Sequence, residues 1–228
     1  MVKQKEQKKD LKFEKRNKRF VDSMSKDPIV KKLSDKWLIA CHKYEYSYHF
    51  TWLGLPIIQY PQDIVAIQEI IWKVKPDLVI ETGIARGGSL LLSASILELI
   101  GHGTVLGIDM DIRKLNKRNI KKNHLIKRIS MIEGPATDKK IVSQVKKFAK
   151  GKKRILLFLD SAHTFEHVLE ELNSYSLKMK FQLSLSFQMV GTSPPISSQR
   201  FLGNCISFSL GNINLYIKGL CIAICIPQ

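Results

Sequence analysis

The chain has 228 residues, of which 44% are hydrophobic and 25% are charged, as in an ordinary soluble globular protein with one full core. No stretch reaches the roughly 18 consecutive apolar residues of a membrane-spanning helix, so we expect no membrane span. The net charge of +17 leaves an anionic membrane or an acidic substrate open as partners, whereas a nucleic-acid partner is not expected, because the basic runs lack base-stacking aromatic interleaving.

Residues 1–36 form a basic arm, with thirteen Lys and Arg against six Asp and Glu. A thin apolar stripe in this arm predicts a helix that docks on another surface; it consists of Phe13, Phe20, Val21 and Met24. No apolar signal segment follows the basic residues, so we expect the cytoplasm, with peripheral contact to an anionic inner membrane face as a further hypothesis. The four cysteines have neither a CxxC pair nor zinc-ligand spacing and are expected to be free thiols.

Residues 37–60 are rich in aromatic side chains, including Trp37, Tyr44 and Trp52. Packing beneath a loop is one interpretation, and the wall of a pocket for a ring-shaped substrate such as a sugar is the other. Apolar residues then recur at helical spacing between Pro61 and Pro76, which predicts a helix between the two prolines.

Short apolar runs and amphipathic segments alternate after this helix. We expect strands near residues 78–80, 104–109, 129–134 and 154–160, and helices near 89–100, 112–123, 138–150 and 164–177. This alternation predicts an α/β fold with a doubly wound, mostly parallel, Rossmann-like sheet covered on both faces. We place the cofactor-binding core at residues 37–180, between the arm and an atypical C-terminal segment at 181–228.

The first of these strands ends in Glu81 and runs into a glycine-rich turn. Gly83 permits a tight turn with positive φ, and Gly87 and Gly88 let a ligand approach the backbone closely. A doubly wound sheet builds its cofactor site at such a turn. The carboxylate is unfavourable for a phosphate and suits a cationic ligand, such as the sulfonium and amino groups of S-adenosylmethionine.

Four successive strands end in a carboxylate, namely Glu81, Asp109, Glu133 and Asp160. The carboxyl ends of parallel strands meet at one edge of the sheet, so we expect the four acids to converge on one crevice. Capping of the following helix is the alternative for any single strand-end acid. For Asp138, capping and contact with an adenine amino group both stay open.

The position of Asp109 suits contact with ribose hydroxyls, which both S-adenosylmethionine and NAD carry. The turn lacks the G-x-G-x-x-G spacing of dinucleotide-binding sites and a Walker lysine, so an NAD-dependent enzyme is the less favoured alternative.

Five ordered blocks over about residues 35–178 resemble the cephalosporin hydroxylase / rhamnosyl O-methyltransferase family. They read WLG…PIIQ…PQD, ETGIARGGS, GIDMDIR, IEGPATD and LDSAHTFEHV. The resemblance implies a class I S-adenosylmethionine-dependent methyltransferase, which in this family often acts on sugar hydroxyls of glycolipids or on small natural products.

The resemblance also implies roles for individual residues. Glu81, Gly83 and Gly87 would hold the methionine part of the cofactor, Asp109 the ribose, and Asp138 the adenine edge. Asp160 would be the first ligand of a divalent metal, such as Mg²⁺, at the acceptor site. Cofactor binding is predicted as well for Ala85, Ser89 and Glu133.

A sugar hydroxyl is a poor nucleophile at neutral pH, so a metal at Asp160 or a base would lower the barrier to methyl transfer. The catalytic candidates are therefore Asp160 and His163, with His167 as an alternative base or a supporting partner. The family commonly has a further His where this chain has Phe165. This difference argues against a catalytic cluster of histidines here.

The C-terminal segment departs from the family. No Asp or Glu follows Glu171, although the family would place an Asp-rich strand end with further metal ligands here. We hypothesise a shift of reading frame near residues 178–181, with a genuinely divergent tail as the alternative. Its candidate strands are at 183–190, 205–210, 213–217 and 220–226.

The sequence thus predicts an S-adenosylmethionine-dependent O-methyltransferase for a sugar, glycolipid or natural-product hydroxyl, impaired in metal-assisted catalysis by its C-terminus. A catalytically dead methyltransferase fold that only binds is the first alternative. A homo-oligomer is left open.

Overall fold

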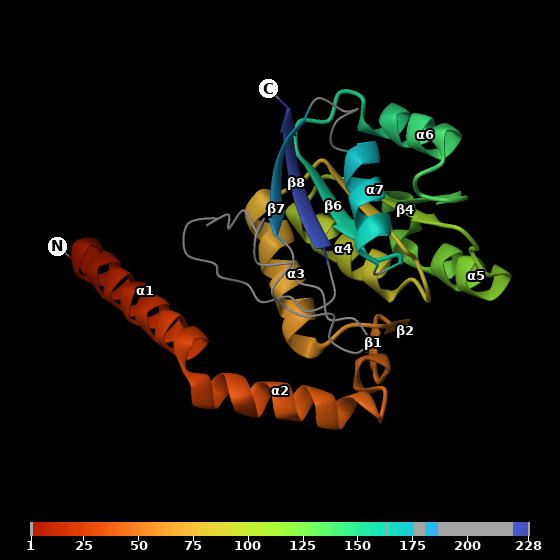
Figure 1. Ribbon diagram of the computed structural model, residues 1–228. Coiled ribbons are helices and arrows are strands. Elements are labelled where there is room, and N and C mark those ends of the chain that lie inside the picture. Colours follow the sequence, from red (N-terminus) through yellow and green to blue (C-terminus); the bar gives the residue numbers. More distant parts are fainter. Residues whose placement is uncertain (1, 163, 176–180, 187–220, 228) are drawn as a thin grey trace. The chain divides into compact units, whose positions relative to one another are not determined.

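The computed structural model describes residues 2–162, 164–175, 181–186 and 221–227, and Figure 1 labels most of their helices and strands. The chain divides into two compact units, one that includes the residues up to Tyr46 and one that begins at Ser47 and contains the main sheet. Each unit is described by itself. None of the described helices is long and apolar enough to cross a bilayer.

The N-terminal unit contains two helices, α1 (Val2–Lys26) and α2 (Pro28–His42). Asp27 separates them, because its side chain accepts hydrogen bonds from the backbone N–H groups of Ile29 at 2.8 Å and Val30 at 3.3 Å. This is N-cap geometry, and proline is tolerated in the first helical turn because that turn leaves N–H groups unpaired anyway. α2 buries none of its residues, so its packing within this unit is slight.

The second unit is built on a six-stranded sheet with the order β5-β4-β3-β6-β8-β7. The strands are β3 (Leu78–Thr82), β4 (Thr104–Asp109), β5 (Ile129–Glu133), β6 (Ile155–Leu159), β7 (Phe181–Ser186) and β8 (Cys221–Pro227). The first four are parallel, whereas β8 pairs antiparallel with both β6 and β7. The predicted α/β fold with a mostly parallel sheet is confirmed.

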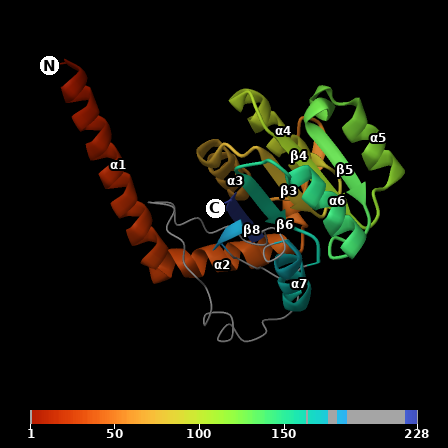
Figure 2. The same cartoon turned by 90° about the horizontal axis from the view of Figure 1, so that it is seen from above.

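Helices cover both faces of this sheet, as Figure 2 shows. One face carries α3 (Pro61–Val74) and α4 (Gly88–Ile100), and the other carries α6 (Lys139–Ala149) and α7 (Phe165–Tyr175). The segment between β4 and β5 contains α5 (Lys114–Lys122) and the short 3₁₀ helix η2 (His124–Arg128).

Successive residues of β3 point to opposite faces of the sheet. Leu78 and Ile80 belong to the apolar core shared with α6 and α7. Val79 and Glu81 therefore point toward α3 and α4. All five residues of β3 are buried, which explains why the central strand reads as a continuous apolar run up to its acidic end.

A small hairpin precedes α3 and consists of β1 (Phe50–Trp52) and β2 (Leu55–Ile57). Its two turn residues, Leu53 and Gly54, both have positive φ, as in the type I′ turn that suits two-residue hairpins. The hairpin packs against the start of α4, since a Cβ at Gly88 would lie 2.4 Å from the carbonyl oxygen of Pro56. This contact helps to position the segment after β2, which contains Gln59, beside the carboxyl end of β6.

Three of the aromatic residues at 37–60 have packing roles in the structure. The indole Nε1 of Trp52 donates a hydrogen bond to Ser95 Oγ on α4 at 3.1 Å. Within the N-terminal unit, Trp37 and Tyr46 pack edge to face with ring centroids 5.2 Å apart. These contacts favour aromatic packing, and the substrate-pocket interpretation stays a prediction.

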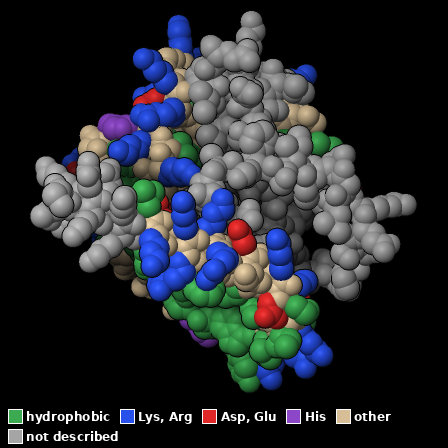
Figure 3. All heavy atoms as spheres, turned by 90° about the vertical axis from the view of Figure 1, so that its left-hand side faces the viewer, with side chains coloured by type: hydrophobic (Ala, Val, Ile, Leu, Met, Phe, Trp, Pro, Cys, Tyr) green, Lys and Arg blue, Asp and Glu red, His purple; other side chains and the backbone are tan. Residues whose placement is uncertain are grey.

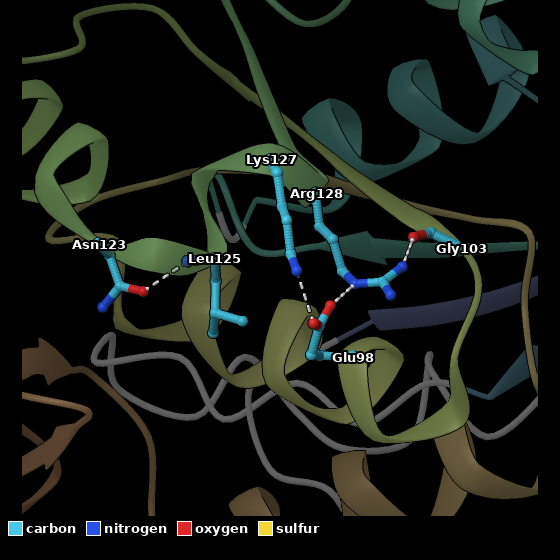
Figure 4. Close-up of polar contacts among 6 residues, drawn as sticks. All are labelled: Glu98, Gly103, Asn123, Leu125, Lys127 and Arg128. Carbon is cyan, nitrogen blue, oxygen red and sulfur yellow. Dashed lines mark hydrogen bonds and ion pairs between the residues drawn. The ribbon is translucent and has the colours of Figure 1, made fainter.

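An ion-pair network ties the C-terminal end of α4 to η2, as Figure 4 shows. Glu98 accepts hydrogen bonds from Lys127 Nζ at 2.7 Å and from Arg128 Nε, and Arg128 Nη1 donates to the carbonyl oxygen of Gly103 at 2.8 Å. The hydrogen bonds from Lys127 and Arg128 lower the pKa of Glu98, and the bond from Lys127 has the larger effect. Because Gly103 precedes β4 and Arg128 precedes β5, this network lies at the amino ends of the strands, away from the strand ends where the acids were predicted to meet.

The C-terminal segment contributes β7 and β8 to the sheet. β7 overlaps the candidate strand at 183–190, and β8 overlaps the one at 220–226. The candidates at 205–210 and 213–217 lie outside the described residues. The hypotheses about reading frame and impaired catalysis stay predictions.

Candidate active site

The turn after β3 is locked into place by its glycines. Gly83 has φ +87°, and a Cβ there would lie 2.2 Å from the carbonyl oxygen of Asp160. Its N–H donates to the carbonyl oxygen of Ile108 at 2.8 Å, so one residue joins the ends of β3, β4 and β6. Only glycine combines this φ with so close a neighbour. Gly87 also has φ +87°, and a Cβ there would meet the side chain of Ile120.

Asp109, at the end of β4, holds the same turn from the side. Its Oδ2 accepts hydrogen bonds from the backbone N–H groups of Ile84 at 2.7 Å and Ala85 at 3.2 Å, and its Oδ1 accepts from Asp111 N–H at 3.1 Å. Ala85 has φ +45°, a conformation uncommon for residues other than glycine. The side chain of Asp109 therefore holds a part of the turn whose backbone conformation is uncommon.

Glu81 is a buried carboxyl at the end of β3, with 2% of its surface exposed. Its Oε1 accepts a hydrogen bond from Ser89 Oγ in the first turn of α4. Burial raises the pKa of Glu81 to about 8, although the bond from Ser89 acts in the opposite direction. At neutral pH this carboxyl is mostly protonated, and a neighbouring positive charge would favour its ionised form.

A small cavity lies beside Glu81, between the sheet and the helices α3 and α4. Its lining consists of Gln59, Ile67, Glu81, Ser89, Leu92, Ser93, Phe158 and Asp160. Gln59 Nε2 donates a hydrogen bond to Asp160 Oδ2 at 3.0 Å. Burial, followed by the charge of Glu81, holds the pKa of Asp160 well above its ordinary value. The cavity thus brings two of the predicted strand-end acids together.

Sequence reasoning assigned no role to Gln59 or to Asp63, which is 1% exposed and also raises the pKa of Asp160. An acid in the first turn of a helix is expected at the surface, where it complements the helix dipole. The pattern around Asp63 therefore carried no signal of burial. Gln59 is brought to Asp160 by the hairpin, 101 residues away in the sequence.

Glu133 and Asp138, which were also predicted to bind the cofactor, are not among the residues that line this cavity. Glu133 pairs in register with Asp109, but its side chain is 49% exposed and forms an ion pair with Lys117 at 3.6 Å. Asp138 caps α6, accepting from the N–H groups of Lys140 at 2.8 Å and Ile141 at 3.3 Å. Capping is therefore the role of Asp138 that the geometry accounts for, and the cofactor contacts of Glu133 and Asp138 stay predictions.

A second polar cluster adjoins Asp160 on the other side of the sheet. Ser161 Oγ donates to Glu171 Oε1 at 2.8 Å and lies 3.0 Å from His167 Nε2, which is itself 3.5 Å from Glu171 Oε1. Glu171 is fully buried, and burial raises its pKa. His167 therefore belongs to a fixed network. His163 lies outside the described residues, so its catalytic role stays a prediction.

Among the residues that the structure describes, no group of three or more His, Cys, Asp and Glu side chains is placed to hold a metal ion. Mg²⁺ binds ionised carboxylates, and one oxygen of the only predicted metal ligand, Asp160, already accepts a hydrogen bond from Gln59. The described residues therefore do not make up a complete magnesium site.

Comparison with known proteins gives one family match. A family model described as "Rhamnosyl O-methyltransferase/CmcI" matches residues 44–181. The rhamnosyl O-methyltransferase of Mycobacterium leprae (strain TN) is 32% identical over 126 residues, which are 54% of this chain and 52% of that protein. The rhamnosyl O-methyltransferase of Mycobacterium tuberculosis (strain H37Rv) is 32% identical over 54% of this chain and 49% of its own length. The chain thus spans about half the length of the curated relatives it matches.

Among solved structures, the apo form of CmcI aligns with a TM-score of 0.42 and 20% identity over 55% of this chain and 51% of that chain. A SAM-dependent O-methyltransferase from Thermotoga maritima has a TM-score of 0.41 and 17% identity over 74% of this chain and 65% of that chain.

Proposed function

Because this chain belongs to the Rhamnosyl O-methyltransferase/CmcI family, we propose that it transfers a methyl group from S-adenosylmethionine to a hydroxyl oxygen. A sugar or glycolipid hydroxyl is the proposed acceptor, in keeping with the name of its mycobacterial relatives. One observation supports S-adenosylmethionine as the cofactor. Two strand-end acids meet at the glycine turn after β3: Glu81 is buried beside the turn, and Asp109 accepts hydrogen bonds from its backbone.

The described residues fit the cofactor at this junction. Glu81 is a buried carboxyl with a raised pKa. A cationic group beside it would lower this pKa and favour the ionised carboxylate, so Glu81 suits the ammonium group of the methionine part. Asp109 has three backbone donors within 3.2 Å. A carboxylate has about four acceptor positions, so about one remains for a ribose hydroxyl. The bound cofactor would supply an electrophilic methyl group on sulfur.

The chain's own task is to place the acceptor oxygen in line with that methyl group and to accept its proton. Asp160 and His163 are the proposed acceptor-side residues. The backbone carbonyl of Asp160 lies against Gly83 of the glycine turn, and His163 follows Asp160 by three residues in the sequence. His167 and Glu171 hold Ser161 next to Asp160, which supports a positioning role for them.

A calorimetric titration tests the cofactor class. The full chain should bind S-adenosylhomocysteine and not NAD, and Glu81→Gln should weaken binding more than Glu133→Gln, whose side chain is half exposed. Binding of NAD without S-adenosylhomocysteine would sink the proposal. Methyl transfer from labelled S-adenosylmethionine to rhamnose-containing glycolipid then tests the acceptor.

A cofactor-binding protein without transferase activity is the second candidate. It is favoured by the hydrogen bond that Asp160 Oδ2 already accepts from Gln59, because that bond occupies the proposed acceptor-side carboxyl. Binding of S-adenosylhomocysteine without methyl transfer to any sugar hydroxyl would select this candidate over the first.

A further inference from the structure

We infer that α1 is a docking surface for an anionic lipid bilayer, an interaction that goes beyond the proposed methyl transfer. The inference rests on two sets of described side chains. The apolar stripe consists of Phe13, Phe20, Val21 and Met24, and the basic face consists of Lys12, Lys15, Arg19 and Lys26.

The apolar stripe is exposed although its residues are large. Phe13, Phe20 and Met24 are 56%, 57% and 58% exposed. Their spacing of seven and four residues places them on one side of the helix. Scattered exposed apolar residues are ordinary, but a contiguous row of aromatic and aliphatic side chains marks an interaction surface.

The basic face covers a different side of the same helix. Lys12, Lys15, Arg19 and Lys26 are separated by three, four and seven residues, so they share a face. Figure 3 shows Lys and Arg side chains lying beside hydrophobic side chains on one side of the molecule. Over its full length α1 has ten Lys and Arg against four Asp and Glu. A helix with Phe on one face and Lys and Arg on the other lies in the interface of an anionic membrane.

Two arginines connect the stripe to the basic side. The guanidinium of Arg16 lies 5.7 Å from the ring centroid of Phe13, and that of Arg19 lies 5.4 Å from the ring centroid of Phe20. Long basic side chains that run along apolar residues can reach lipid phosphates while the rings enter the acyl boundary.

The same pattern recurs in α2. Ile29, Leu33 and Trp37 follow one another at four-residue intervals and are 69%, 62% and 46% exposed. Lys31 lies on the opposite face of the helix, whereas Lys32 and Lys36, three and seven residues after Ile29, lie along the edge of this apolar row. Tryptophan is enriched where proteins meet the membrane interface. Two consecutive helices of one unit therefore present apolar rows beside basic residues.

An anionic bilayer accounts for both sets of side chains at once. Nucleic acid would bind the basic face but leave the exposed stripe without a role. A second copy of the chain would cover the stripe but bring two strongly basic helices together. Lipid headgroups and acyl chains complement the charge and the apolar row respectively.

Sedimentation of the full chain with vesicles tests this. One set is pure phosphatidylcholine, and the other contains about one-third phosphatidylglycerol, enough to give a negative surface. We expect binding to the anionic vesicles only, weakened by high salt, which screens surface charges. Lys15→Gln with Arg19→Gln should weaken it roughly 30-fold, from the contribution of about two basic residues. Phe20→Gln with Met24→Gln should weaken it at least tenfold, through lost apolar burial.

The matched control is Lys121→Gln with Lys122→Gln, which removes the same charge from exposed positions on α5. It should leave vesicle binding within about twofold, because those residues lie outside α1. S-adenosylhomocysteine binding and far-ultraviolet circular dichroism should be unchanged in all three variants, which reports that each one folds.

Three results would overturn the inference. The first is equal binding to neutral and anionic vesicles, and the second is an equal loss in the α5 control. The third is α1-dependent binding to an RNA homopolymer, or α1-dependent self-association, without vesicle binding.

Discussion

The buried carboxyl of Glu81 should make the stability of the protein depend on pH in a defined direction. Its pKa is about 8 in the folded chain and has an ordinary value of 4.5. A carboxyl whose folded pKa is raised binds its proton more tightly in the folded state, so stability falls as pH rises from about 4.5 to about 8. At about 1.4 kcal/mol per pKa unit, the full cost is about 5 kcal/mol above pH 8 and about 3 kcal/mol at pH 7.

Glu81→Gln removes this titration and keeps an oxygen that can accept from Ser89. Urea unfolding at pH 5 and pH 8.5 would measure the free energy of unfolding of both proteins. The decrease between the two pH values should be smaller in the variant by about 4 kcal/mol. Asp160 and Glu171 also have raised pKa values, so both curves slope downward. Because the charge of Glu81 also raises the pKa of Asp160, the difference between the curves reports Glu81 together with its interaction with Asp160.

Glu133→Gln is the control, since it alters a strand-end carboxyl that is half exposed and should leave the curve unchanged. Parallel curves for the wild type and Glu81→Gln would refute the reasoning. A linked experiment uses S-adenosylhomocysteine. If its ammonium meets Glu81, binding at pH 7 should release nearly one proton, which calorimetry in two buffers of different ionisation enthalpy detects. The variant should release none.

Three further predictions concern folding and are measured as free energies of unfolding in urea. Gly83→Ala should cost about 3 kcal/mol or more, because its Cβ would overlap the backbone directly after β6. Gly101 has a similar φ but open space around it, so Gly101→Ala should cost about 1 kcal/mol. Equal costs for the two variants would contradict the role of the close approach at Gly83. Asp138→Ala should cost about 1 kcal/mol through loss of the α6 cap, and Asp138→Asn, which can still cap, should retain most of it. Tyr175→Phe should cost about 1 kcal/mol, because it loses the 2.6 Å hydrogen bond from the Tyr175 hydroxyl to the carbonyl oxygen of Ala136 in the loop after β5. An unchanged free energy of unfolding would mean that this hydrogen bond makes no net contribution to stability.

The order of elements was predictable because each signal is local. Apolar runs of five or six residues predict buried strands, and Pro61 and the glycine turn mark helix starts. Asp27 followed by Pro28 is a local signal for a helix start, a cap followed by proline, but the sequence-based prediction for the arm was a single docking helix without this break.

The candidate site was predictable only in part. Four strand-end acids were expected to converge, and Glu81 and Asp160 do line one cavity. Glu133 belongs to the same sheet edge, but its side chain is half exposed beside Lys117. Position along a strand is encoded locally, whereas the direction and burial of a side chain depend on the neighbours that the fold brings to it.

The sequence by itself thus determined the α/β alternation, the glycine turn and the strand-end placement of the acids, because these follow from spacing and backbone conformation. Only the tertiary structure decided which carboxyls are buried. Gln59 reaches Asp160 across 101 residues, and α3 and α4 close over Glu81. Burial sets the pKa of an acid, and burial is a property of the packed elements rather than of the residue or its neighbours in sequence.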